Sequence, residues 1–373
     1  MIGKVGVIVS IILFCIAVGF YSFAQLSMAD KGKDVDLLSF VPLDCAGVLE
    51  TDNPDFLVNE FPQTTYGLQL DTLRQSGLFP MVLKAVFPNA DSTVHRLSNR
   101  IERMMISFHS PVSARNVVMY FHTHDSGRDF LQQMMQRQGV KFVPKRESYR
   151  GKDIDIYALD NGDFISAYCG KGFCVLSYQK NLIEQVIDAR KDETSLREDP
   201  LFLGCYEDKA VNFITLYGHA ASLPLLVEDH AQCWSSFDIH LSSEVFYLSG
   251  STVLPDSCQA HVDGKLHCIA PVETDGVLAL SGQERIDSCL SHVIAVPQHT
   301  LFQECISNLS RDASFIFVAD MDKVEGDALK GCQPYLPKFV VRHADLFRSF
   351  ILSIQITKVG NKLSHIFVFT YKN

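Results

Sequence analysis

Two histidines in the first half of the chain are well spaced for metal chemistry. The stretch Tyr120-Phe-His122-Thr-His124-Asp125 places His122 and His124 two positions apart. On a strand, side chains two positions apart point to the same side, and histidine is a common metal ligand. This spacing supports the hypothesis of a metal-assisted hydrolase that uses His122 and His124. The alternative is purely structural: a strand end followed by a helix whose cap is Asp125 or Ser126.

Two cysteines are spaced for a disulfide. In the stretch Ala167-Tyr-Cys169-Gly-Lys-Gly-Phe-Cys174, a two-residue turn at Lys171-Gly172 would place Cys169 directly opposite Cys174 in a hairpin. The alternative is a pair of small core residues that face each other as free thiols. None of the 11 cysteines is spaced as CxxC, which argues against zinc ribbons and thioredoxin-like sites.

Two further groups of residues resemble chemical motifs but are incomplete. Cys258, His261, His267 and Cys268 could be four metal ligands, but the intervening Val262-Asp263-Gly264-Lys265 predicts a hairpin turn, which separates His267 and Cys268 onto opposite faces. Ser177-Tyr-Gln-Lys180 matches the SxxK of serine acyl-enzymes, yet the SDN and KTG elements of those enzymes do not occur. We therefore predict no catalytic residues and no cofactor.

The N-terminus predicts a membrane anchor. Residues 5–24 carry no charge, and about 20 apolar residues suffice to cross a bilayer. We expect a signal-anchor helix over 1–24 and a linker over 25–38, with the folded part outside the membrane, in the periplasm. A cleaved signal peptide is the alternative, because Ser27-Met28-Ala29 matches a cleavage site.

The rest of the chain alternates strand and helix patterns and predicts an α+β fold. Strands are expected at 46–51, 104–109 and 116–122, and a helix begins at Asp125-Ser126 with Phe130, Leu131, Met134 and Met135 on one face. We predict largely antiparallel sheets with helices packed on one face. The expected units are 39–190, a strand-rich middle unit over 191–266, and 267–373.

One phrase occurs twice. The stretch FVPLDCAGVLE, residues 40–50, matches IAPVETDGVLA, residues 269–279, and a helix is expected after each copy, the second over 283–293. The strands at 351–357 and 365–371 can be compared with those at 104–109 and 116–122. This pattern predicts that 267–373 is a diverged repeat of 39–124, and chance similarity is the alternative.

The chain resembles a class of envelope-anchored bacterial proteins of unknown function that are built of repeated α+β units. Three features carry this resemblance: the N-terminal span, the stretch VPLDCAGVLE and the stretch WSSFDIHLSSEVFYLSG. This resemblance implies an exported, anchored protein and supplies no active-site residues.

The net charge and the distribution of basic residues argue against one class of binding partner. The net charge of −10 and the absence of a basic cluster argue against nucleic acid. We therefore expect a non-enzymatic envelope protein that binds a protein partner. The alternatives are the hydrolase described above and a carrier or sensor of an apolar ligand or lipid.

Overall fold

The architecture is described by a computed structural model of the chain. It describes residues 35–54, 100–111, 113, 115–140, 143–206, 213–219, 233–242, 245–297, 300–324, 326–336, 340–341 and 344–372. The predicted anchor over 1–24, most of the predicted linker and the helix expected after the first copy of the repeated phrase lie outside these residues.

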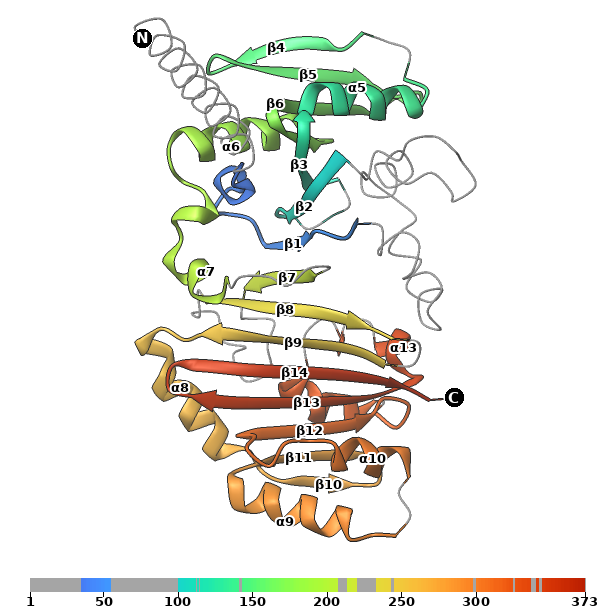
Figure 1. The fold of residues 1–373 in the computed structure, drawn as a ribbon. Helices are drawn as coiled ribbons and strands as arrows, with labels where there is room; N and C mark the ends of the chain where they lie inside the picture. The colour runs from blue at the N-terminus through green and yellow to red at the C-terminus, as the bar shows by residue number, and fades with distance from the viewer. Residues whose placement is uncertain are drawn as a thin grey trace, which may run out of the picture.

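The 14 described strands form one antiparallel sheet, shown in Figure 1. Its strand order is β10-β11-β12-β13-β14-β9-β8-β7-β1-β2-β3-β6-β5-β4. The strands are β1 (Gly47–Thr51), β2 (Ile101–Phe108), β3 (Val117–Ser126), β4 (Lys145–Tyr149), β5 (Lys152–Ala158), β6 (Phe164–Ser177), β7 (Ile214–His219), β8 (Trp234–Leu241), β9 (Val245–Val253), β10 (Val272–Thr274), β11 (Val277–Ser281), β12 (Phe315–Asp320), β13 (Phe350–Val359) and β14 (Lys362–Tyr371). The predicted α+β class with a largely antiparallel sheet is confirmed.

Helices lie on both faces of this sheet, so the expectation of one covered face is wrong. Along β3, Val118 and Tyr120 join the core that contains α6, whereas Met119 and Phe121 join the core that contains α5. Successive strand residues point to opposite faces, so unbroken apolar runs such as VVMYF need cover on both sides. The described helices are η1 (Leu37–Phe40), α5 (Gly127–Arg137), α6 (Lys180–Lys191), η5 (Leu196–Glu198), α7 (Pro200–Cys205), α8 (Asp256–Cys268), α9 (Gln283–Ile294), α10 (Leu301–Ser307), α11 (Asp327–Cys332), η7 (Gln333–Tyr335) and α13 (Ala344–Phe347).

The two halves of the sheet begin alike at the centre, where β1 pairs antiparallel with β7. Outward from this pair, β1-β2-β3 is followed by β6, and β7-β8-β9 is followed by β14, which is the last described strand of its half in chain order, as β6 is. A helix follows at the same point in each half, α5 after β3 and α8 after β9. Farther out the second half contains more strands, β13-β12-β11-β10 against β5-β4. The repeat of 39–124 in 267–373 and the boundaries of the three units remain predictions.

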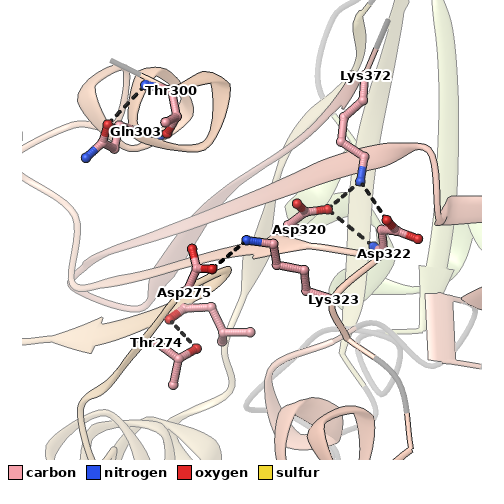
Figure 2. Close-up of polar contacts among 9 residues, drawn as sticks. Thr274, Asp275, Thr300, Gln303, Asp320, Asp322, Lys323 and Lys372 are labelled. Carbon is pink, nitrogen blue, oxygen red and sulfur yellow. Dashed lines mark hydrogen bonds and ion pairs between the residues drawn. The ribbon is translucent and has the colours of Figure 1, made fainter. Parts of the chain in front are cut away.

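The glycine in each copy of the repeated phrase has a different structural role. The first leads into β1 at the centre of the sheet, where a Cβ on Gly47 would lie 2.8 Å from the carbonyl oxygen of Tyr217 on β7. The second forms the turn between β10 and β11, where Gly276 has a φ of 122°. Beside it, Lys323 Nζ lies 2.9 Å from an oxygen of Asp275 (Figure 2). Glycine is required in both copies, once by a close approach and once by its backbone conformation.

The segment with two cysteines and two histidines is a helix, and the hairpin expected there is wrong. It is α8, in which Val262 and Leu266 are buried four positions apart, as on one face of a helix. Gly264, a residue typical of turns, lies inside this helix, and a Cβ at its position would meet open space, so no close contact requires glycine there.

Candidate functional site

His122 and His124 lie beside the same carboxylate near the end of β3. The Nδ1 atoms of His122 and His124 are 3.4 Å and 3.9 Å from Oε2 of Glu102. His122 is buried, whereas the His124 side chain is 55% exposed. Among the described residues, no group of three or more His, Cys, Asp and Glu side chains is placed to hold a metal ion. Metal binding by the two histidines remains a prediction.

The helix cap expected at the end of β3 is also present. Ser126 is the N-cap of α5, and its Oγ accepts a hydrogen bond from the backbone N–H of Asp129 at 3.4 Å. Asp125 instead forms an ion pair with Arg100 at 3.0 Å. The apolar face predicted for this helix is buried as expected, with Phe130, Leu131, Met134 and Met135 in the core.

His122 lines a cleft with a volume of about 610 Å³. The cleft lies where β1, β2 and β3 meet the segment that contains η1, and η5 and the end of α7 complete it. Its lining is rich in charged side chains. The lining residues are Val35, Asp36, Leu37, Leu38, Glu50, Asp52, Glu102, Arg103, Met105, His122, Arg197 and Tyr206.

A buried carboxylate, Glu50, is the central charged group of this cleft. The Glu50 side chain is fully buried on β1, and its Oε1 accepts hydrogen bonds from Arg103 Nη1 at 3.1 Å and from the Tyr206 hydroxyl at 3.2 Å. Burial, and then the charge of Glu50, raise the pKa of Tyr206 well above its ordinary value. Tyr206 therefore remains a protonated donor at neutral pH.

A second ion pair in the cleft is more open to solvent. Arg197 Nε lies 3.2 Å from an oxygen of Asp36, and both side chains are about half exposed. The cleft thus sets guanidinium groups beside carboxylates, and an imidazole and a phenol belong to the same lining. This arrangement suits a polar ligand that offers both hydrogen-bond donors and acceptors.

Most of this site has no local signal in the sequence. Glu50, Arg103, Arg197 and Tyr206 come from different elements and converge only through the sheet and the helices on it. His122 alone was a candidate from its spacing. Glu50 lies in the repeated phrase, where the sequence indicated only a strand.

The two cysteines expected to face each other do so. Cys169 Sγ and Cys174 Sγ are 2.9 Å apart, and both thiols are free. Five residues of straight strand would separate them by about 16 Å. The chain therefore turns back within β6, at Gly172, whose φ is 78°. The disulfide between them remains a prediction.

The SxxK residues are engaged with other groups. Ser177 is fully buried, and its Oγ donates to the carbonyl oxygen of Val117 at 2.8 Å. The Lys180 ammonium forms ion pairs with Glu147 at 2.7 Å and with Glu184 at 3.1 Å. This arrangement provides no activated serine.

Comparison with protein families and with curated proteins finds no match. Two solved structures of the protein TP0453, its crystal forms IV and I, are similar to this chain with 10% and 12% sequence identity. Each comparison covers 65% of this chain and 90% of the other, with a TM-score of 0.33. Similarity at this level assigns neither a fold relationship nor a function. In the part of the chain that the structure describes, no helix has the length and apolar character needed to cross a membrane.

Proposed function

We propose that this chain is a non-enzymatic binding protein of the bacterial cell envelope, anchored by residues 5–24. The uncharged run at these positions supports the anchor. On this proposal the sheet lies outside the inner membrane and the cleft beside β1 binds a polar segment of another envelope protein.

The observation that carries the binding role is the buried carboxylate of Glu50 in an otherwise accessible cleft. Burying a charge is costly unless it is paired, and Arg103 and Tyr206 both satisfy its Oε1. The partly exposed Arg197 and Asp36 nearby provide charges that an incoming polar segment can pair with.

Copurification of the tagged full-length protein from its native membrane, in mild detergent, tests this proposal. The matched variants are Arg197→Glu, which reverses one charge in the cleft, and Lys152→Glu, which reverses an exposed charge on β5. We expect the wild type and Lys152→Glu to retain a stoichiometric companion that Arg197→Glu loses. Recovery of the wild-type protein alone, or equal retention by both variants, contradicts binding at the cleft.

The metal-assisted hydrolase is the second candidate, and it rests on the spacing of His122 and His124 alone, because these two side chains and Glu102 do not form a group placed to hold a metal ion. It requires a transition metal in the purified full-length protein that the His122→Ala, His124→Ala double variant lacks. A metal content equal in the two proteins rules this function out. The charged lining of the cleft does not favour the apolar-ligand carrier, whose test is lipid that copurifies with the protein.

A further inference from the structure

We infer that Cys169 and Cys174 are a dithiol–disulfide site that closes the turn within β6 when the chain meets a disulfide oxidant. The chemistry of the pair follows from its geometry. Only the supply of an oxidant rests on the proposed function, because export would place the chain in an oxidising compartment.

The two sulfur atoms are already positioned for bond formation. They are 2.9 Å apart, and a disulfide needs about 2.05 Å, so closure requires a movement of only about 1 Å. The turn between them is tight. A Cβ on Gly170 would lie 2.4 Å from the ring of Phe173, so the chain is already folded back on itself at the residues between the two cysteines. Forming the bond therefore requires no rearrangement of the strands.

The two thiols differ in access, which assigns their order of reaction. Cys169 is partly exposed, whereas Cys174 is fully buried in the core under α5. Burial, and then its contact with Cys169, raise the pKa of the Cys174 thiol. An external oxidant therefore reaches Cys169 first.

The reaction balances with a disulfide such as oxidised glutathione as oxidant. The Cys169 thiolate attacks one glutathione sulfur, and the other glutathione leaves as a thiolate. Cys174 then loses its proton and attacks Cys169 Sγ, which releases the second glutathione. Two thiols of the protein are oxidised to one disulfide, and one glutathione disulfide is reduced to two thiols.

The turn that this bond would close supports neighbouring elements. Phe173 is the register partner of His122 on β3, and Lys171 is the partner of Ser126. Gly127, the first residue of α5, packs so closely that a Cβ there would lie 1.7 Å from the Phe173 carbonyl oxygen. A disulfide between Cys169 and Cys174 would thus stabilise the turn on which α5 begins, one strand away from the cleft. We expect the midpoint of thermal unfolding to rise by a few degrees on oxidation.

A peptide-level measurement tests this site directly. Trypsin cleaves after Lys171, so Cys169 and Cys174 fall in separate peptides, 153–171 and 172–180, each with a single cysteine. The purified full-length protein is equilibrated with reduced and oxidised glutathione, its free thiols are alkylated, and the digest is analysed by mass spectrometry. We expect the two peptides to be joined, with the loss of two hydrogen atoms, as the share of oxidised glutathione increases.

The controls separate a paired site from general thiol reactivity. In Cys174→Ser, we expect Cys169 to carry glutathione instead of a link, as the exposed Cys268 does in both proteins. Unlinked peptides in the wild type at every glutathione ratio, with Cys169 glutathionylated or alkylated, would overturn the inference.

The same digest of native cells, with thiols trapped by acid and alkylation, tests the environment separately. Linked peptides there support both the site and an oxidising compartment. Alkylated cysteines in cells, with linkage in the purified protein, leave the site in place and contradict the proposed export.

Discussion

Arg103 on β2 and Glu50 on β1 are joined by an ion pair of 3.1 Å between Nη1 and Oε1. The two side chains differ in environment, because Glu50 is fully buried and the Arg103 side chain is 42% exposed. The arginine therefore reaches from solvent to a carboxylate in the interior. Its guanidinium also lies over the ring of Phe213 at 5.6 Å, which orders it further.

We predict that Arg103→Met destabilises the protein, because it leaves a buried carboxylate without its cationic partner. The expected loss is about 2 kcal/mol in the free energy of unfolding, less than for a wholly buried pair because water already screens Arg103. Urea unfolding followed by the fluorescence of Trp234, the one tryptophan of the chain, measures this loss. The matched control is Arg197→Met, which removes the more exposed ion pair with Asp36 and should cost at most about 1 kcal/mol. Equal losses in the two variants would contradict a special role for the buried carboxylate.

Two glycines at the centre of the sheet are register partners, and we predict that alanine substitutions at them affect stability differently. Gly47 on β1 pairs with Gly218 on β7, but only Gly47 is constrained, since its Cβ would lie 2.8 Å from the Tyr217 carbonyl oxygen. Backbone cannot yield as a flexible side chain does, so we expect Gly47→Ala to cost about 2 kcal/mol in the free energy of unfolding. Gly218 has no neighbour within 4 Å of its Cβ position, and Gly218→Ala should leave stability nearly unchanged. A comparison of urea midpoints decides this, and a loss in Gly218→Ala as large as in Gly47→Ala would show that the close contact is not the cause.

Local patterns in the sequence predicted several elements well. The expected strands at 104–109 and 116–122 correspond to β2 and β3, and the helix expected over 283–293 is α9. Each has a strong local signal, either an apolar run of strand length or apolar residues at helical spacing. The helix α8 was missed because Gly264 and Asp263 are typical of turns, and the buried Val262 and Leu266 are too few to outweigh them.

These local patterns could not predict which strands that are far apart in the sequence pair with each other. The contact of β1 with β7 joins residues far apart in the sequence, and no spacing rule predicts such a neighbour. The cleft shows the same limit, since Glu50, Arg103 and Tyr206 meet only after the strands are assembled. His122 was found because its partner in the pattern, His124, lies on the same strand.

A buried histidine makes the stability of the fold depend on pH. His365 on β14 is fully buried beside the rings of Phe237 and Phe367, and its Nε2 donates to the carbonyl oxygen of Ser236 at 2.9 Å. Its register partner is Gly250, whose missing Cβ leaves space for the imidazole. Burial lowers the pKa of His365 from 6.5 to about 4.

The sign of the effect follows from the lowered pKa. Below the ordinary pKa of 6.5 the unfolded chain binds a proton on His365, whereas the folded chain binds it only near its own pKa of about 4. The stabilisation is therefore complete above pH 6.5 and is lost as the pH falls toward 4, with a loss from His365 of about 2 kcal/mol by pH 5. Burial also lowers the pKa of His109, which adds a loss of the same sign. We expect His365→Gln to weaken this pH dependence of the unfolding free energy and His240→Gln, at an exposed position, to leave it unchanged. Urea unfolding at about pH 7 and about pH 5 gives the comparison, and a slope in His365→Gln as steep as in the wild type would assign the effect to other groups.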